Sequence, residues 1–357
     1  MVRRQSEMTA RGGRRPAGGL LLLLGSALLL GASCAPVGPS RQYAGPQEIP
    51  AEILAYYDYP KRPIEAKVTI KAQKKRYDIL QIEFPSTLNV FGNENIRIDY
   101  YVGREEEVVG PAGTPNAKHR VWEPDPPYEP RRPTVLMLPI SGGVDFSVES
   151  FARLFVAHGI NCALVHNRKV RIKGTQSAEE VEAYFRQTVL DNRQVLDYLV
   201  TRADVDPNRL GCLGLSLGGI KTSLVAAVDR RIRCAVLGLA GGSMADITMN
   251  SKMHGLKEYV DELQALGGEP ALIYGELKEK VRTDPLRLAP YLDARKTLLF
   301  LAGFDQVVPT WTGKQLRQAI GGPQTIYLLA GHYTSFLYLP FAQWQSLGFV
   351  KKKFGMK

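Results

Sequence analysis

A five-residue motif, Gly214-Leu215-Ser216-Leu217-Gly218, constrains the fold of this chain more than any other feature. The apolar run 209–213 precedes it and is typical of a buried strand, and residues 219–227 after it are typical of a helix. A serine between a strand end and a helix start occupies a sharp, strained turn, where side chains two positions away on either side would collide. The motif therefore predicts that Ser216 is an exposed nucleophile at a helix N-terminus. The alternative is an ordinary glycine-rich turn.

The rest of the chain favours an α/β architecture. Continuous apolar segments, each the length of a strand, alternate with helical patterns from residue 134 onward. The predicted strands are 134–138, 160–165, 209–213, 234–239, 297–301 and 325–329, and the predicted helices are 151–158, 179–202, 219–227, 313–320 and a last one from 341. This alternation predicts a mostly parallel central sheet with helices on both faces. Alternating polar and apolar residues over 66–83 and 95–102 predict antiparallel strands before it.

Three further segments complete the predicted organisation of the 65–357 domain. Residues 35–64, rich in Pro, Gly, Gln and Tyr, are predicted to form a tether, and 103–133, with seven prolines, a long loop. Residues 242–293 lie between two predicted strands and carry helical patterns around 257–266 and 271–281. We interpret this insertion as a small helical cap over the active-site side. A merely structural insertion is the alternative.

The N-terminus has the features of an export signal. Five arginines precede an apolar run from Leu20 to Leu30, which is short for a membrane span. Small residues then lead to Cys34, so residues 1–34 resemble a bacterial lipoprotein signal, although Gly31 stands where leucine is usual. The resemblance implies lipidation of Cys34 and a membrane-anchored protein of the cell envelope. Secretion after cleavage at Ala35 and an uncleaved anchor are the alternatives.

Charge and cysteine usage exclude several other classes of protein. The net charge is +11, but residues 1–33 supply +4 of it through five Arg and one Glu, and no nucleic-acid motif accompanies the rest. We therefore expect no nucleic-acid partner. Cys162, Cys212 and Cys234 each lie in an apolar, strand-like run, which predicts buried structural thiols. Their spacing fits no zinc site.

A serine nucleophile needs a base, usually a histidine held by a carboxylate. The chain has five histidines, and only His332 follows the last predicted strand directly, on a loop at its carboxyl end; the others are His119, His158, His166 and His254. Asp305 follows the preceding strand, whereas Asp284 precedes it and has the context of a turn residue. Ligands gather at the carboxyl ends of parallel strands, so we expect Ser216, Asp305 and His332 to meet in one crevice.

These segments resemble the α/β-hydrolase superfamily, in its esterase, dienelactone-hydrolase-like and prolyl-oligopeptidase-like branches. The similarity rests on Val205–Gly219, on the loop 303–309 and on Gly331-His332. It implies an α/β-hydrolase fold and a Ser216, His332, Asp305 catalytic triad. It also implies an oxyanion hole with one backbone N–H from Leu217 and a second from Gly143, with Gly142 and Ser141 as alternatives.

The sequence therefore predicts a serine hydrolase that cleaves a carboxylic ester or a related acyl bond, with no metal or cofactor. Its substrate is expected to be a small molecule or an acyl compound, and Trp311 and Tyr333 are candidates for its pocket. A peptidase or an acyltransferase on the same fold, and a non-catalytic envelope binding protein, are the alternatives. The sequence indicates no oligomeric state.

Overall fold

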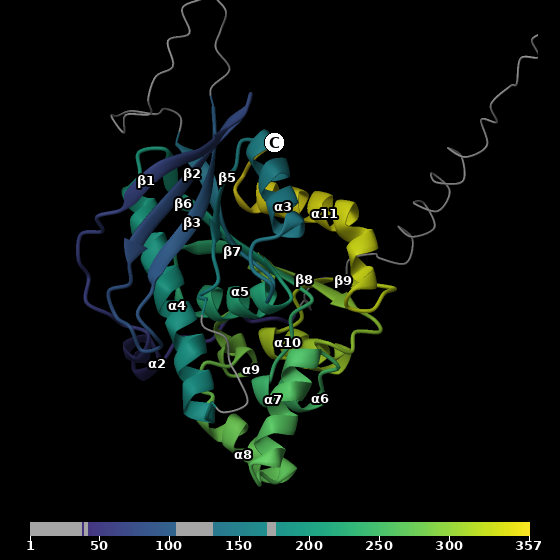
Figure 1. Cartoon of the computed structure of the whole chain (residues 1–357). Coiled ribbons are helices and arrows are strands. Elements are labelled where there is room, and N and C mark those ends of the chain that lie inside the picture. The colour runs from purple at the N-terminus through teal and green to yellow at the C-terminus, as the bar shows by residue number, and fades with distance from the viewer. Residues whose placement is uncertain (1–37, 39–41, 105–130, 170–175) are drawn as a thin grey trace, which may run out of the picture.

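The computed structural model describes residues 38, 42–104, 131–169 and 176–357. Cys34, His119, the predicted signal and most of the proline-rich loop lie outside these residues. A nine-stranded sheet forms the centre of the molecule, in the order β1-β2-β3-β5-β4-β6-β7-β8-β9 (Figure 1). The strands are β1 (Lys67–Gln73), β2 (Tyr77–Pro85), β3 (Asn95–Gly103), β4 (Arg132–Leu138), β5 (Asn161–Val165), β6 (Val205–Leu215), β7 (Ile232–Gly238), β8 (Thr297–Ala302) and β9 (Gln324–Leu328).

The direction of the strands divides the sheet into two parts. From β5 to β9 every neighbouring pair is parallel, whereas β1, β2 and β3 pair antiparallel, and β3 joins β5 antiparallel. The strands β4, β5, β7 and β8 are almost entirely buried because helices cover both of their faces, and β6 is buried from Leu210 to Gly214. The mostly parallel sheet predicted from the apolar strand pattern is confirmed.

The helices form two layers, with α3 and α11 over one face and α4, α5 and α10 over the other (Figure 1). Those layer helices are α3 (Phe146–Ala157), α4 (Ala178–Thr201), α5 (Leu217–Val228), α10 (Thr310–Ile320) and α11 (Leu339–Lys353). The helix α4 begins with a capping box, in which Ser177 and Glu180 each accept the other's backbone N–H. No helix among the described residues is long and apolar enough to span a membrane.

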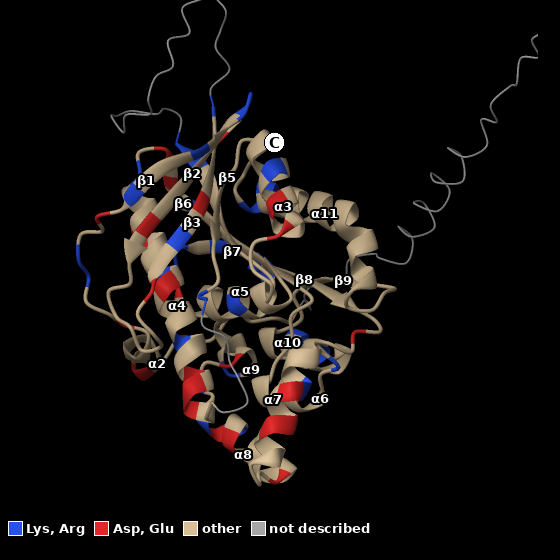
Figure 2. Ribbon diagram, viewed as in Figure 1, with Lys and Arg blue, Asp and Glu red and all other residues tan. Residues whose placement is uncertain are grey.

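The insertion between β7 and β8 carries four short α-helices, drawn in the lower part of Figure 1. They are α6 (Met244–Asn250), α7 (His254–Ala265), α8 (Pro270–Lys280) and α9 (Pro285–Leu288). Acidic residues are frequent on α4, α7 and α8, whereas Lys and Arg are more frequent around β1–β3 and the C-terminus (Figure 2). The insertion packs on the α5 side of the sheet, within the same apolar core as α5 and α10.

Two predictions about the N-terminal half need correction. The alternating run 66–83 is two strands, because residues 74–76 make a hairpin turn between β1 and β2. Residues 42–64, expected to be part of a tether, instead pack on the domain and include the helix α2 (Ala51–Tyr56). Tyr57 is only 1% exposed, and its hydroxyl donates to the hydroxyl of Thr283 in the insertion. The aromatic residues of this segment therefore serve as packing anchors.

Candidate active site

Ser216 lies at the turn between β6 and α5, with a backbone φ of +54°. Its N–H donates to the carbonyl of Gly238 in β7, which fixes the turn against the sheet. A side chain at Gly214 would collide with the carbonyl oxygen of Gly218, and one at Gly218 with that of Leu138. Both glycines are therefore required by close backbone approach. The strained φ is the conformation expected of a nucleophile held out from a strand end.

The structure brings Ser216, His332 and Asp305 into one series of hydrogen bonds. The distance from Ser216 Oγ to His332 Nε2 is 2.9 Å, and that from His332 Nδ1 to Asp305 Oδ2 is 2.7 Å. The neutral imidazole tautomer with its proton on Nδ1 donates to Asp305 and accepts from Ser216, so it satisfies both contacts. His332 and Asp305 are buried, whereas Ser216 lines two cavities.

Backbone groups hold the carboxylate and the imidazole in place. Asp305 Oδ1 accepts from the N–H groups of Val307 and Val308, each at 2.9 Å. The hydroxyl of Ser335 donates to the His332 carbonyl, and the Tyr333 ring meets the His332 ring edge-on at 5.5 Å. The Asp305 carboxylate and the His332 imidazole are therefore oriented by contacts with residues other than the three that form the series of hydrogen bonds.

The other three histidines that the structure describes, and Asp284, lie elsewhere and have other partners. His158 Nδ1 contacts the Leu154 carbonyl, His166 lies beside Asp99, and His254 is exposed near Glu258. The Asp284 side chain caps α9 by accepting from the backbone of Leu286 and Arg287, so it is a turn residue as its context indicated. The three described cysteines are buried and unpaired, as predicted.

The loop after β4 lies beside Ser216 and offers backbone N–H groups for an oxyanion. Ser141, Gly142 and Gly143 all line the larger cavity at Ser216, together with Leu217. The Gly143 N–H donates to the Ile140 carbonyl at 3.0 Å. The N–H groups of Ser141, Gly142 and Leu217 have no acceptor among the described residues. Leu217, Ser141 and Gly142 therefore line the cavity with N–H groups that no described group accepts, and Ser141 and Gly142 are the alternatives to Gly143 that the sequence leaves open.

Asn167 and Lys221 support this loop, and the sequence analysis did not single them out. The Asn167 side-chain amide donates to the Ile140 carbonyl at 2.7 Å, and Lys221 Nζ donates to the Asn167 Oδ1 at 2.9 Å. Lys221 is 4% exposed, also donates to the Tyr184 hydroxyl, and has no carboxylate partner among the described residues. A lysine within the apolar pattern of the helix after the serine is the only sequence signal for this arrangement.

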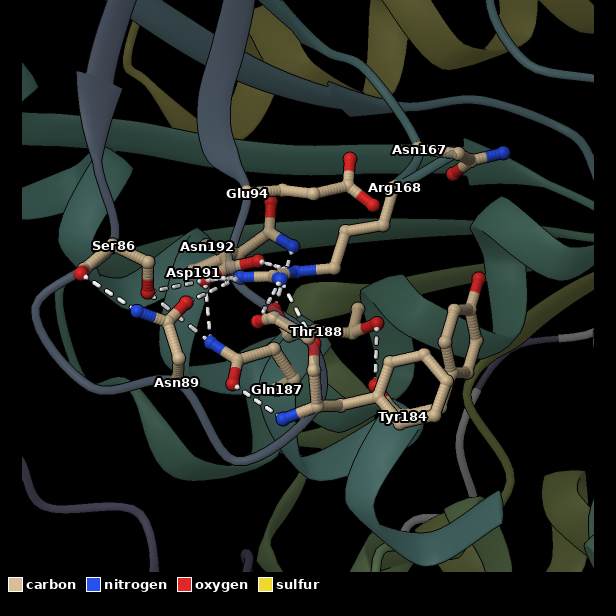
Figure 3. A network of polar contacts seen from close by, with 12 residues as sticks. Ser86, Asn89, Glu94, Asn167, Arg168, Tyr184, Gln187, Thr188, Asp191 and Asn192 are labelled. Carbon is tan, nitrogen blue, oxygen red and sulfur yellow. Dashed lines mark hydrogen bonds and ion pairs between the residues drawn. The ribbon is translucent and has the colours of Figure 1, made fainter. Parts of the chain in front are cut away.

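The residue after Asn167 anchors the same segment. Arg168 is almost fully buried and forms a two-point ion pair with Asp191 of α4, at 2.7 Å and 3.1 Å (Figure 3). Its guanidinium also donates to the carbonyls of Phe91 and Gly92. Such planar two-point pairing restricts orientation as well as position. The chain at Asn167 is thereby fixed to the α4 layer.

Two cavities open at Ser216. The larger, of about 650 Å³, lies between the loop after β4, α4 and the insertion, whose Met244, Met253 and Tyr259 line it. The smaller, of about 110 Å³, lies between His332, the sheet and the helices α3 and α11, and Tyr333 lines it. Trp311, also predicted at the pocket, lines neither of the two cavities. The insertion thus forms one wall of the larger cavity, in the position expected of a cap.

The chain resembles a known protein family and a bacterial hydrolase in sequence. The model of the prolyl oligopeptidase family matches residues 146–328, just over half of the chain, which includes Ser216 and Asp305 and ends before His332. The putative hydrolase YtaP of Bacillus subtilis is 35% identical over 77 residues, which span 21% of this chain and only 26% of that protein.

Solved structures share the fold at low sequence identity. An acetyl xylan esterase from Paenibacillus sp. R4 has a TM-score of 0.62 and 16% identity, over 85% of this chain and 99% of the esterase. Acetyl xylan esterase 1 from Thermoanaerobacterium sp. JW/SL YS485 has a TM-score of 0.58 and 17% identity, over 86% and 97%. At such identities the likeness establishes the α/β-hydrolase fold.

Proposed function

This chain belongs to the prolyl oligopeptidase family of α/β-hydrolases, and from that premise we propose that it cleaves carboxylic esters through an acyl-enzyme at Ser216. The observation that carries the proposal is the continuous series of hydrogen bonds from Ser216 Oγ through His332 to Asp305, located where two cavities meet. It supplies a nucleophile, a base in contact with it, and a carboxylate that orients the base.

The geometry supports a two-step reaction. His332 Nε2 takes the proton of Ser216 as Oγ attacks the ester carbonyl, and Asp305 stabilises the resulting imidazolium. Backbone N–H groups of Leu217 and of Ser141 or Gly142 hold the oxyanion, assisted by the N-terminus of α5. The tetrahedral intermediate collapses when the C–O bond to the alcohol breaks and His332 protonates the leaving oxygen. Water, activated by His332, then releases the acid and restores Ser216.

The lining of the larger cavity favours an ester over a peptide. Its described lining is mostly apolar and aromatic, with a few neutral polar side chains and Lys169, and it contains no Asp or Glu. Arg168 also lines it, but its guanidinium is already paired with Asp191. Recognition of a free amino terminus needs an acidic partner, so this lining suits a neutral or anionic acyl group. The fold neighbours described as acetyl xylan esterases agree with this proposal. Because the matching family is named for a peptidase, amide hydrolysis is the second candidate function.

Labelling with a fluorophosphonate probe tests the nucleophile. We expect the folded protein to be labelled at one site, and Ser216→Ala to abolish labelling and to lower ester turnover at least ~10⁴-fold. Ser223→Ala, a buried serine on α5 that bonds to a backbone carbonyl, is the matched control and should label normally. Folded wild-type protein that resists labelling would favour the binding-protein alternative.

Matched p-nitrophenyl esters and p-nitroanilides with acyl groups of two to twelve carbons then separate the two candidate activities. Turnover of the esters with little turnover of the anilides is the expected result. Comparable turnover of the anilides would make the protein a peptidase.

We also propose that the protein is exported and anchored to the cell envelope through a lipid on Cys34, on the sequence features alone. Cysteine lipidation leaves a mature N-terminus that starts at the modified residue. Mass spectrometry of the membrane fraction should therefore find an acylated peptide that begins at Cys34. Cys34→Ser should move the protein to the soluble fraction. An N-terminus elsewhere in the wild-type protein would support plain secretion or an uncleaved anchor.

A further inference from the structure

The two cavities at Ser216 differ in which parts of the proposed machinery they contact. Both are lined by Ser216 and Ser141. His332 lines only the smaller cavity, whereas Leu217 and Gly142 line only the larger one. His332 and Leu217 therefore lie on different sides of Ser216, and Ser141 lies between the two cavities.

The smaller cavity is enclosed by apolar walls. Phe151 of α3, Leu339 of α11 and three sheet residues, Val236, Phe300 and Leu328, contribute to them. Its volume is about 110 Å³. Apolar cavities of roughly 150 Å³ hold a benzene molecule. The smaller cavity has less volume than that, so a short branched alkyl chain fits it, one aromatic ring is its upper limit, and a fused two-ring group is excluded.

We propose that the smaller cavity binds the alcohol part of the substrate, so that the enzyme acts on esters of a bulky acid with a compact, ring-sized alcohol. This inference rests on the proposed function. When the C–O bond breaks, the leaving oxygen must receive its proton from His332, so the alcohol leaves on the His332 side of Ser216. The carbonyl oxygen points to Leu217, and the acyl chain occupies the larger cavity, which has about six times the volume.

A leaving-group series tests the size limit. Methyl, benzyl and 2-naphthylmethyl esters of one acid have alcohols of similar acidity, so differences in kcat/KM report fit rather than leaving ability. We expect benzyl to be the best of the three and naphthylmethyl to be at least about tenfold worse than benzyl, the scale of a pocket that rejects excess bulk. A flat series would overturn the inference.

Ala342→Leu reduces the smaller cavity from the α11 side, at a partly buried position. The ratio of kcat/KM for benzyl over methyl esters should fall at least about tenfold. Ala319→Leu, at a partly buried position of α10 that lines neither cavity, is the matched control and should keep the wild-type ratio. If Ala342→Leu instead changes the preference among acyl groups at a fixed methyl alcohol, the cavity holds the acyl part and the assignment is wrong.

Fluorophosphonate labelling separates these outcomes from failure of the proposed function. A labelled protein with a flat ester series loses only the pocket assignment, whereas an unlabelled one loses both.

Discussion

Asp305 uses its two carboxylate oxygens for different tasks. Oδ1 accepts from two backbone N–H groups, and Oδ2 contacts His332 Nδ1. Asp305→Asn can keep its oxygen toward the backbone, but then its NH₂ faces Nδ1. His332 must then accept at Nδ1 and carry its proton on Nε2, where it can no longer take the proton of Ser216. We expect kcat for p-nitrophenyl acetate to fall about 10⁴-fold.

The melting temperature of Asp305→Asn should stay close to that of the wild type, because the backbone contacts of the loop are kept. Thermal unfolding followed by circular dichroism measures this. A kcat within tenfold of wild type in a folded variant would remove Asp305 from the proposed triad.

Asn167 acts on the reaction only through the loop that it holds. Its amide donates to the Ile140 carbonyl, one residue before Ser141. Asn167→Ala leaves that carbonyl without this donor and frees the oxyanion loop to shift. A displacement of about 1 Å at such a loop costs roughly 10²-fold in rate. We expect kcat to fall between about tenfold and 100-fold while KM changes less, because the walls that α4 and the insertion supply to the larger cavity are kept.

Two companion variants make the Asn167 prediction specific. Lys221→Met keeps the buried stem but loses the donor to Asn167, so it should lower kcat in the same direction and by less. Asn208→Ala changes an exposed position near the start of β6, whereas Ser216 follows the end of that strand, so it should leave kcat unchanged. Equal loss of kcat and binding in Asn167→Ala would indicate general disruption of the site instead.

The sequence could predict the members of the hydrogen-bond series but not their support. Ser216, Asp305 and His332 each follow a strand, and a parallel sheet brings its carboxyl ends together whatever the details of packing. Asn167 and Lys221 meet the loop through side-chain contacts between β5 and α5, and no local pattern encodes such a contact. The same holds for Gly143, whose N–H is taken up by a turn that only the folded loop reveals.

Strands and helices followed the sequence closely wherever one periodicity extended over the whole element. The strands β4, β5, β7, β8 and β9 can be predicted because both of their faces are covered, which leaves continuous apolar runs. The strand β6 starts at Val205, before the predicted run 209–213, because its first residues are polar and partly exposed. The start of α3 was predicted five residues too late, because Asp145 caps the helix by accepting from Val148 and the exposed Phe146 hides the pattern. The hairpin at 74–76 was missed because its turn carries Lys and Arg instead of the usual turn residues.

A charged cluster links α4, the end of α5 and the start of β7. Arg231 contacts both Asp229 and Asp197, and Asp197 also accepts from the Tyr59 hydroxyl. Burial raises the pKa of Asp229, but the hydrogen bond and charge of Arg231 outweigh it, so this pKa lies below its ordinary value of 3.8. A lowered pKa means that the ion pair contributes stability above the ordinary pKa and loses it as the pH falls through the lowered one.

Asp229→Asn should therefore lower the free energy of unfolding by about 3 kcal/mol at pH 7, because it leaves the Arg231 charge with one partner fewer. Between pH 4 and pH 2 the difference from wild type should shrink, since Asp229 becomes protonated in the wild type as well. Urea unfolding at pH 7, 5 and 3 measures this. Asp206→Asn removes a more exposed pair with Arg209 and should cost less than about 1 kcal/mol at every pH. A constant loss from pH 7 to pH 3 would contradict the electrostatic explanation.

Segments from three parts of the chain meet at Glu182, behind the larger cavity. Glu182 of α4 accepts from the Tyr56 hydroxyl and from both the backbone and the hydroxyl of Thr283. Burial raises the pKa of Glu182 above its usual value in spite of these donors. Asp284, the residue after Thr283, accepts from the backbone N–H of Met244, and Met244 lines the cavity. The N-terminal segment is thus connected through the insertion to the substrate side of the molecule.

This connection predicts that residues 42–64 belong to the folded unit. A chain that starts at residue 38 should unfold with the same midpoint as the full domain. A chain that starts at residue 65 loses the buried Tyr57 and Tyr59 and leaves Glu182 without one donor. We expect this shorter chain to unfold at a clearly lower urea concentration. If it folds, KM should rise more than kcat falls, since the insertion loses its anchor while the hydrogen-bond series is unchanged.

Tyr57→Phe isolates one bond of this anchor without shortening the chain. It removes the hydroxyl that donates to Thr283 at 2.9 Å and keeps the buried ring, so it should cost about 1 kcal/mol of unfolding free energy. Tyr274→Phe removes a hydroxyl whose partner, Lys278, lies at the surface, and should cost almost nothing. Equal losses in the two variants, or equal stability of the chains that start at 38 and 65, would mean that the N-terminal segment lies on the domain without stabilising it. We expect the segment to stabilise the domain. On folding, the Tyr57 ring becomes buried, and its hydroxyl exchanges its hydrogen bonds with water for one to Thr283.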